Sequence, residues 1–290
     1  MYKTTLLKNS KIVYYVIILI IFVVYITRTN RRYTMSKSVS FKNSKNLTLK
    51  GTLWPASSDA MVIMAHGSGS NKLARGLFPE IAQALAHECY NVLSFDFSGH
   101  GESDDAVFTL QQSVDDVASA LAYAKKLGCK KFALIGHSIG VYSCLKNYSS
   151  GVKTIIGIGG LTGPVQWQWE SMCSPEQLEG LHKTGYIAAE VNDGLREVLT
   201  IDGNLLKDIQ AINQEKLFRG AQCPVLLIHG DAESDSQELD LLAISQQGVP
   251  FLYEGSQLKI IPGANHTFVE VSDQVIKLIK DWFKENFPLS

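Results

Sequence analysis

The sequence has no excess of positive charge, and this property is the first to limit its function. Its 290 residues include 27 Lys and Arg against 28 Asp and Glu, which gives a formal net charge of -1. Proteins that bind nucleic acid carry a basic patch or stripe that neutralises phosphates. We therefore expect no nucleic-acid partner.

Cysteines are few, and no cofactor signature is present. The five cysteines form no CxxC pair and no spacing typical of a metal site, which indicates free thiols in a reducing compartment. The sequence contains no Rossmann or Walker motif, and no cluster of Asp, Glu and His suggests a metal site. We expect neither a metal ion nor another cofactor.

Only one long apolar run occurs, and it lies near the N-terminus. Residues 12–26 are uninterrupted apolar residues with lysines before them and arginines after them. A helix of this length rises about 22 Å, less than the ~30 Å hydrocarbon core, but its tyrosines suit the membrane interfaces. We expect residues 1–34 to form a single-pass membrane anchor through residues 12–27, with the folded domain in the cytoplasm. Alternatively, translation begins at Met35 and the protein is soluble and cytoplasmic.

From Met35 onward, short apolar runs alternate with helical stretches. There are eight short β-type runs: SVSF, LTLKGTLW, MVIMAH, NVLSFDF, KFALIG, KTIIGIGG, CPVLLIHG and LKIIPG. The later ones are near-continuous apolar runs, which are typical of parallel strands buried on both faces. Between them lie stretches with apolar residues at helical spacing, one of which we expect to begin at the N-cap Ser113 and to end at Gly128. We predict an α/β fold over residues 35–290, a mostly parallel doubly wound sheet with an antiparallel start.

One segment interrupts this alternation. Residues 161–222 contain several polar helical pieces and no strand signal, and about 60 residues is too long for a simple connection. We therefore predict a helical cap over the ends of the strands. Trp167 and Trp169 either line a substrate pocket in this cap or pin the cap to the core.

The sequence KKFALIGHSIG places Ser138 between two glycines, directly after an apolar strand. In the pattern G-x-S-x-G, a serine sits on a tight strand-to-helix turn whose neighbours must be small. Gly136 and Gly140 would remove the side chains that collide there. Because ligands of α/β sheets bind at the carboxyl ends of the strands, we predict that Ser138 is a catalytic nucleophile.

A serine hydroxyl needs a base that removes its proton and an acid that orients the base. His266 follows a late strand in IIPGANHTF and is the only histidine after Asp231, so we predict that it is the base. The turn in LLIHGDAESDSQ offers three carboxylates. Among these we favour Glu233 as the acid, with Asp235 as the second choice.

The negative oxygen of a tetrahedral intermediate needs hydrogen-bond donors. MAHGSGSN places a glycine-rich loop after an early strand, and we predict that the backbone N–H groups of Ser68 and Ile139 form this oxyanion hole. His66 is interpreted as a residue that orients the loop. The remaining histidines are interpreted as structural: His87, His100, His137, His182 and His229.

Four segments together resemble one family: FDFSGHGESD, LIGHSIG, LLIHGDAE and IPGANHTF. From about Ser36 to its end, the chain resembles the α/β-hydrolase superfamily. Within it, the chain is similar to small serine esterases that include the cinnamoyl and feruloyl esterases, and to the serine aminopeptidase-like (S33) group. That family often reads HGxxD at the acid turn, and its aspartate falls on Glu233.

The resemblance implies hydrolysis of a small-molecule carboxylic ester through an acyl-enzyme intermediate. A thioesterase, lipase, amidase, peptidase or acyltransferase would use the same three side chains. A membrane-tethered binding protein without catalysis is the alternative from another class, since a fold alone does not establish a function. The substrate and the oligomeric state stay open.

Overall fold

The computed structural model describes residues 35–191 and 195–289. Within these residues, no helix is long and apolar enough to cross a bilayer. This finding corrects our prediction of a single-pass membrane protein. The apolar run itself, residues 12–26, lies outside the described residues.

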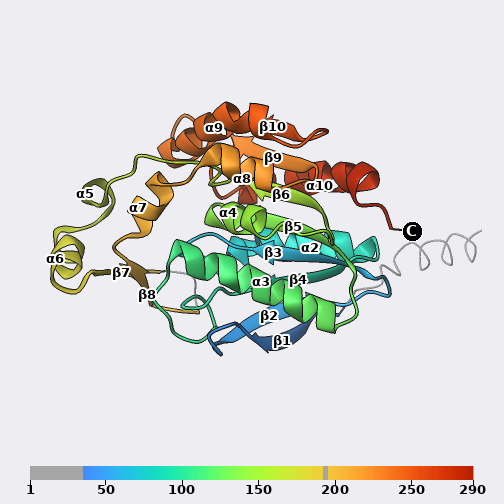
Figure 1. Cartoon of the computed structure of the whole chain (residues 1–290), viewed down its shortest axis with the longest axis horizontal. Coiled ribbons are helices and arrows are strands. Elements are labelled where there is room, and N and C mark those ends of the chain that lie inside the picture. The colour runs from blue at the N-terminus through green and yellow to red at the C-terminus, as the bar shows by residue number, and fades with distance from the viewer. Residues whose placement is uncertain (1–34, 192–194, 290) are drawn as a thin grey trace, which may run out of the picture. The chain divides into compact units, whose positions relative to one another are not determined.

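The domain that begins at Ser36 is built on an eight-stranded sheet (Figure 1). The strand order is β1-β2-β4-β3-β5-β6-β9-β10. The strands are β1 (Lys37–Lys42), β2 (Thr48–Trp54), β3 (Ala60–Ala65), β4 (Asn91–Phe95), β5 (Lys131–His137), β6 (Val152–Ile158), β9 (Val225–Gly230) and β10 (Gln257–Ile261). Each of the eight β-type runs in the sequence has become one of these strands.

The pairing of the strands confirms the predicted fold class. β1 and β2 pair antiparallel, β2 pairs antiparallel with β4, and every further neighbour in the sheet is parallel. All residues of β3 and β9 are buried. Alternate residues of β3 enter two different core clusters, with Ile63 in one and Val62 in the other. Apolar residues on both faces explain why these strands are continuous apolar runs in the sequence.

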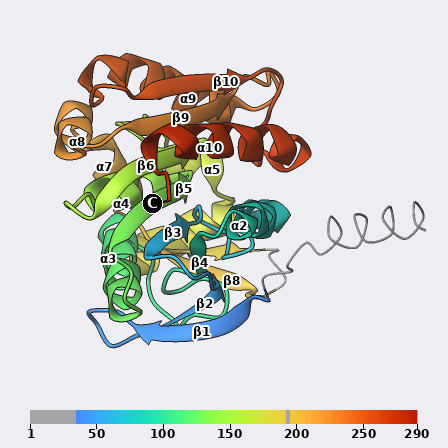
Figure 2. The ribbon, with the colours of Figure 1, turned by 90° about the vertical axis from the view of Figure 1, so that its right-hand side faces the viewer.

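Helices cover both faces of the sheet (Figures 1 and 2). On one face α2 (Leu77–His87) packs beside α10 (Ser272–Asn286), and on the other α3 (Leu110–Lys126) packs beside α4 (Ile139–Lys146). The predicted start of α3 was wrong. Thr109 caps this helix by accepting a hydrogen bond from the Gln112 N–H, whereas Ser113 lies inside the first turns and bonds Ser143 on α4.

Six elements lie between β6 and β9, in the segment that we predicted as a cap. They are α5 (Trp169–Met172), α6 (Pro175–Thr184), β7 (Tyr186–Glu190), β8 (Val198–Asp202), α7 (Leu205–Gln210) and α8 (Gln214–Gly220). The expectation that this segment contains no strand was wrong, because β7 and β8 form an antiparallel pair. Their strand signal is weak because only Ile187, Leu199 and Ile201 of the pair are buried.

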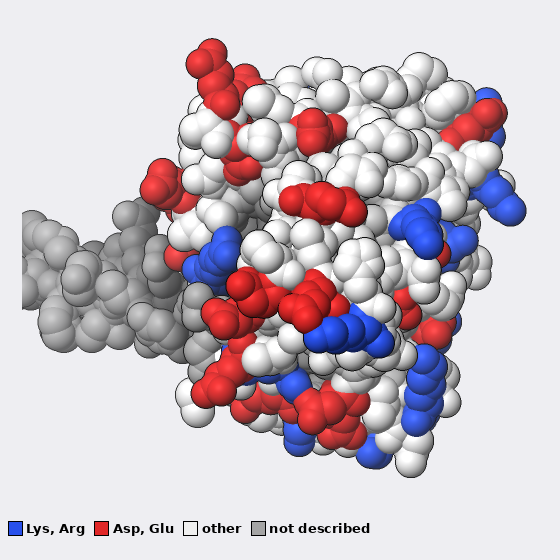
Figure 3. Space-filling view, turned by 90° about the vertical axis from the view of Figure 1, so that its left-hand side faces the viewer, with Lys and Arg blue, Asp and Glu red and all other residues white. Residues whose placement is uncertain are grey.

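The β7–β8 pair is fixed to the main domain through β8. The N–H of Phe108 donates to the carbonyl of Thr200 at 2.8 Å, and the N–H of Asp202 donates to the carbonyl of Phe108 at 3.0 Å. Figure 3 views the domain from the end that carries α6 and β7, and acidic side chains gather on that face.

Candidate active site

Ser138 occupies a strained backbone position between β5 and α4. Its φ is 55° and its ψ is -123°, a backbone conformation that residues other than glycine rarely adopt. Strain of this kind is maintained only where the surrounding structure fixes the chain. Here the N–H of Ser138 donates to the carbonyl of Ile158 on β6, and the N–H of Leu161 donates to the carbonyl of Ser138, each at 3.0 Å.

The two glycines that flank Ser138 are required by close backbone approaches. A Cβ on Gly140 would lie 2.1 Å from the carbonyl oxygen of Ala65 on β3. A Cβ on Gly136 would lie 2.5 Å from the backbone of Gly140 and Val141. Both distances are shorter than any Cβ contact in a real protein, so only glycine fits at either position.

His266 lies in the turn after β10, and its imidazole is held by a carboxylate that we did not predict. His266 Nδ1 lies 2.7 Å from Oε2 of Glu238, whose side chain is fully buried. Glu238 belongs to the first turns of α9 (Ser236–Gly248). Because a carboxylate accepts, the Nδ1 atom carries the proton and donates it, which leaves Nε2 unprotonated in the neutral ring.

The carboxylates that we considered in the sequence have other places. Glu233, our first choice, is exposed and makes no hydrogen bond or ion pair with any described residue. Asp235 is the N-cap of α9, and its Oδ2 accepts from the backbone N–H of His266 at 2.7 Å. Asp231 accepts from the N–H of Gly263. Of the carboxylates on this turn and helix, Glu238 therefore contacts the His266 ring.

The ionisation of Glu238 is set by two opposing influences. Burial raises the pKa of its carboxyl, but hydrogen bonds from His229 and His266 outweigh burial and lower the pKa to about 2. Glu238 is consequently a carboxylate at neutral pH. A buried negative charge beside His266 stabilises the imidazolium that forms when His266 accepts a proton.

Two buried histidines hold the glycine-rich loop that faces Ser138. His66 Nε2 accepts from the N–H of Phe97 at 3.0 Å, while its Nδ1 donates to the carbonyl of Gly67. His100 Nε2 accepts from the N–H of Gly69. Burial, together with the nearby His66, lowers the pKa of His100 to about 3, so this ring stays neutral and continues to accept.

The loop approaches Ser138 closely at Gly67. A Cβ on Gly67 would lie 3.0 Å from Cβ and 3.6 Å from Oγ of Ser138. The predicted donors, the N–H groups of Ser68 and Ile139, both border the same pocket as Ser138. Neither group donates a hydrogen bond to any residue that the structure describes. Among the described residues, these two backbone N–H groups therefore have no acceptor within the protein.

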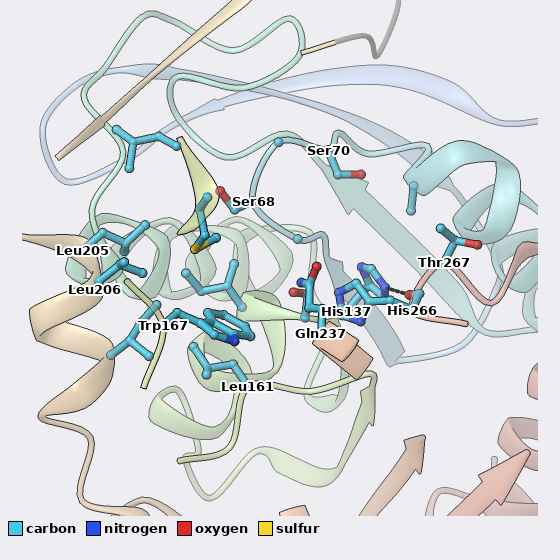
Figure 4. Close-up of a pocket in the computed structure, with 18 of the residues that line it drawn as sticks. Ser68, Ser70, His137, Leu161, Trp167, Leu205, Leu206, Gln237, His266 and Thr267 are labelled. Carbon is cyan, nitrogen blue, oxygen red and sulfur yellow. Dashed lines mark hydrogen bonds between the residues drawn. The ribbon is translucent and has the colours of Figure 1, made fainter. Parts of the chain in front are cut away.

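His137, the residue before Ser138, supports the turn that carries His266. His137 Nε2 donates to the carbonyl of His266 at 2.7 Å, drawn as a dashed line in Figure 4. Burial, together with the neighbouring His266, lowers the pKa of His137 to about 3. His137 is therefore neutral with its proton on Nε2, and its hydrogen bond ties the backbone of His266 to the residue before Ser138.

The pocket above Ser138 has an apolar side and a polar side (Figure 4). Its volume is about 310 Å³, and it contains Ser138, His266 and the glycine-rich loop. Leu161, Trp167, Leu205 and Leu206 lie on one side, and Ser70 and Thr267 lie on the other. A cavity of this size accommodates a small organic ligand.

Both alternatives for the tryptophans are present together. Trp167 and Trp169 line the pocket, and each also fixes the segment in place through its indole N–H. Trp167 Nε1 donates to Asp240 on α9, and Trp169 Nε1 donates to the carbonyl of Gly203, each at 2.9 Å. Trp167 thus ties the beginning of the predicted cap to α9, whereas the hydrogen bond of Trp169 lies within the cap.

This fold and this serine turn together define an α/β hydrolase. The sequence model of the alpha/beta hydrolase family matches residues 62–278, and the chain belongs to that family. Comparison with curated proteins gives no significant match.

Many solved structures share the fold at low sequence identity. The hydrolase GrgF from Penicillium sp. is 17% identical with a TM-score of 0.68, covering 87% of this chain and 99% of its own. Est1E from Butyrivibrio proteoclasticus, solved with ferulic acid, is 20% identical with a TM-score of 0.67, covering 86% and 98%. The Pyrococcus furiosus esterase Pf2001 is 18% identical with a TM-score of 0.67, covering 90% and 94%.

Proposed function

We propose that the chain is a serine hydrolase that cleaves carboxylic esters through an acyl-enzyme intermediate. Ser138 is the nucleophile, His266 is the base, and Glu238 takes the role that we first gave to Glu233. The observation that carries this proposal is the 2.7 Å hydrogen bond between His266 Nδ1 and the buried Glu238, beside a serine on a strained turn. The likeness to esterases supports an ester as the substrate class.

The reaction follows from the protonation states of these groups. Ser138 Oγ attacks the carbonyl carbon of the ester while His266 Nε2 takes the hydroxyl proton. The N–H groups of Ser68 and Ile139 bind the negative oxygen of the tetrahedral intermediate. As this intermediate collapses, the C–O bond to the alcohol breaks and His266 gives the proton to the departing oxygen. Water then attacks the acyl-enzyme by the same steps and releases the acid.

No hydrogen bond joins Ser138 Oγ to His266 among the described residues. Catalytic hydrogen bonds are often long when no substrate is bound, and they tighten in the complex. We therefore expect the hydrogen bond between Ser138 Oγ and His266 Nε2 to form when substrate is bound.

The position of His266 orients the substrate in the pocket. His266 must reach the departing oxygen, so the alcohol part of the ester lies on the side of His266 and Thr267 (Figure 4). The acyl part then points to the opposite side, toward Trp167, Leu205 and Leu206. We therefore propose a substrate with an apolar acyl group of modest size.

Covalent labelling tests the proposal directly. A fluorophosphonate probe should label the wild-type protein, and Ser138→Ala should abolish both labelling and hydrolysis of p-nitrophenyl acetate while the circular dichroism spectrum is unchanged. Ser150→Ala is the matched control, because Ser150 is exposed in the turn before β6. Labelling that persists in Ser138→Ala would refute the mechanism. A wild-type protein that neither labels nor turns over would indicate the non-catalytic binding protein.

A further inference from the structure

The carboxylate of Glu238 is shared between two histidines. Its Oε2 accepts from His266 Nδ1 at 2.7 Å, while its Oε1 accepts from His229 Nδ1 at 2.8 Å and from the N–H of Gly230 at 3.0 Å. The side chains of His229 and Glu238 are both fully buried. Each carboxylate oxygen therefore has a fixed set of donors.

We infer that His229 is a positioning residue of the active site, which acts on His266 through Glu238. The working unit is then a chain of four side chains: Ser138, His266, Glu238 and His229. This inference rests on the proposed function, because it assigns His229 a role in the same reaction. His229 touches no substrate and reaches the nucleophile only through the other members of the chain.

The position of Glu238 explains why such a residue is needed. A glutamate on a helix has three rotatable side-chain bonds, so its carboxylate is less constrained than that of an aspartate on a turn. Two donors on Oε1 fix the plane of the carboxylate and leave Oε2 to face His266. The backbones of Glu238 and His266 are also held next to each other, since Asp235 accepts from the N–H groups of both residues.

The state of the His229 ring supports a role for its Nδ1–H. Since a carboxylate only accepts, Nδ1 must donate, and Nε2 is then an acceptor in the neutral ring. His229 Nε2 is buried and has no hydrogen-bond partner among the described residues. Leaving a buried polar atom unpaired costs free energy, so an apolar side chain would serve simple packing better. We conclude that the imidazole is present for the hydrogen bond that it donates to Glu238.

Among the described residues, His229 Nδ1 and the N–H of Gly230 are the donors to Glu238 Oε1. The titratable and charged groups that face the Glu238–His266 pair are His229 from β9, Asp235 at the N-cap of α9, His137 at the end of β5 and, across the pocket, Arg75. From β6 the approach is closed by Gly159, on which a Cβ would lie 2.8 Å from Glu238 Oε2 and 2.9 Å from His266 Nδ1. These two hydrogen bonds to Oε1 therefore offset part of the free-energy cost of burying the Glu238 carboxylate.

Three substitutions of His229 separate the role of its hydrogen bond from the role of its volume. In His229→Asn the side-chain amide can occupy the position of Nδ1 and can still donate to Glu238. In His229→Gln the amide lies nearer the position of Nε2, away from Glu238. His229→Leu removes the donor altogether. Each variant is compared with the wild type by its melting temperature, kcat, KM and the pH dependence of kcat/KM.

We expect His229→Leu and His229→Gln to lower kcat on the order of ten- to a hundredfold with KM nearly unchanged. Removing the hydrogen-bond partner of a metal-bound histidine has an effect of this size. The acid limb of kcat/KM should move to higher pH, because a Glu238 carboxylate that has lost one donor holds the proton of the His266 imidazolium more strongly. His229→Asn should retain most of kcat and the wild-type limb. The downfield proton resonance of His266 Nδ1–H should persist in His229→Asn and weaken in His229→Gln.

The outcome that overturns the inference is equal behaviour of the Asn and Gln variants, whether both are active or both are impaired. If the role of His229 were purely structural, its substitution would lower the melting temperature. The acid limb and the His266 proton resonance of the folded fraction would then be unchanged. These results are separable from failure of the proposed function, because fluorophosphonate labelling of Ser138 in the wild type is measured first. A variant of His229 that labels more slowly than the wild type at equal folded concentration supports the role.

Discussion

Glu238 Oε2 lies 2.7 Å from His266 Nδ1 and reaches it from the beginning of α9 rather than from the turn after β9. The carboxylate that we propose as the acid thus belongs to a helix, where its side chain is buried and its backbone is hydrogen-bonded. The exposed turn carboxylate Glu233 lies five positions earlier and is free of any such contact among the described residues.

The first prediction separates these two glutamates. Glu238→Gln should lower kcat on the order of 10³- to 10⁴-fold with little change in KM, because the amide favours the wrong tautomer of His266. Glu233→Gln, the matched control, should keep activity within about twofold of the wild type, since surface substitutions have small effects. Steady-state kinetics on p-nitrophenyl acetate measures both. The opposite result, with Glu233→Gln inactive, would restore our original assignment.

The strands and the turn that carries Ser138 could be predicted from the sequence, because they depend on local geometry. Ser138 is recognisable because Gly136 and Gly140 are imposed by backbone contacts within one turn and its neighbouring strand. The strands are recognisable because burial on both faces makes each of them a continuous apolar run. These features require little knowledge of distant residues.

The carboxylate that contacts His266 could not be identified in the same way, because the contact joins residues that are distant in the sequence. Any carboxylate after β9 that reaches His266 in space can serve, and the family pattern pointed to Glu233. A signal for Glu238 was nevertheless present. Glu238 falls on the buried face of α9 together with Leu241, Leu242 and Ser245, at the spacing of one helical face. A carboxylate on an apolar face needs a partner, which is a reason to consider it functional.

The second prediction concerns Gly159, which closes the space beside the acid and the base. A methyl group there would lie within 3 Å of both Glu238 Oε2 and His266 Nδ1, and the φ of +52° adds backbone strain. Gly159→Ala should therefore lower kcat on the order of a hundredfold or more, because small misplacements of catalytic groups have effects of that size.

The control for this change is Gly180→Ala on α6. A Cβ at Gly180 meets nothing within 4 Å, so alanine should be neutral or should raise stability slightly, as expected inside a helix. Both variants are examined by thermal unfolding and by kcat. Full activity of a folded Gly159→Ala variant would contradict the arrangement of Glu238 and His266 described here.

The third prediction concerns stability against acid. The pKa of Glu238 is lowered from 4.5 to about 2 in the folded protein, so its carboxylate stabilises the fold at pH values above about 4.5. This contribution is lost as the pH falls from about 4.5 toward about 2, because the unfolded chain then binds a proton that the folded chain does not. Glu238→Gln lacks a titrating group at this position.

The free energy of unfolding of the wild type should therefore fall more steeply with decreasing pH than that of Glu238→Gln across this range. Urea unfolding at a series of pH values measures the two slopes. Parallel slopes would show that Glu238 has an ordinary pKa and is not held by the two histidines.

The fourth prediction concerns the length of the acyl group. Leu161, Trp167, Leu205 and Leu206 line the side of the pocket that we assign to the acyl chain. Each buried methylene contributes about 0.8 kcal/mol, so kcat/KM should rise about fourfold per methylene from acetate to butanoate. The cavity of about 310 Å³ is too small for hexadecanoate, for which kcat/KM should fall. A series of p-nitrophenyl esters gives the profile, and a rate that keeps rising to hexadecanoate would contradict the assignment.

The fifth prediction concerns Arg75, the one charged residue among the described residues that line the pocket. It lies in η1 (Ala74–Gly76), where Ala74, Arg75 and Gly76 all have positive φ values of 43°, 56° and 102°. Ala74 and Arg75 are strained in this region, whereas Gly76 adopts it freely. The loop before them is fixed by the buried ion pair of Lys72 and Asp96, 2.7 Å apart. The fold thus presents a cation on the segment that leads into α2.

In Figure 4 the ribbon of α2 lies on the Ser70 and Thr267 side of the pocket, the side that we assign to the alcohol. Esters whose alcohol part carries a carboxylate should therefore be preferred over their neutral amide counterparts. Arg75→Gln should reduce the ratio of the two kcat/KM values about five- to tenfold, as expected for a partly exposed charged hydrogen bond, mainly through KM for the anionic ester. Arg219→Gln, on α8 and paired with Glu215, is the control and should preserve the ratio. An unchanged ratio in Arg75→Gln would show that this cation does not select the substrate.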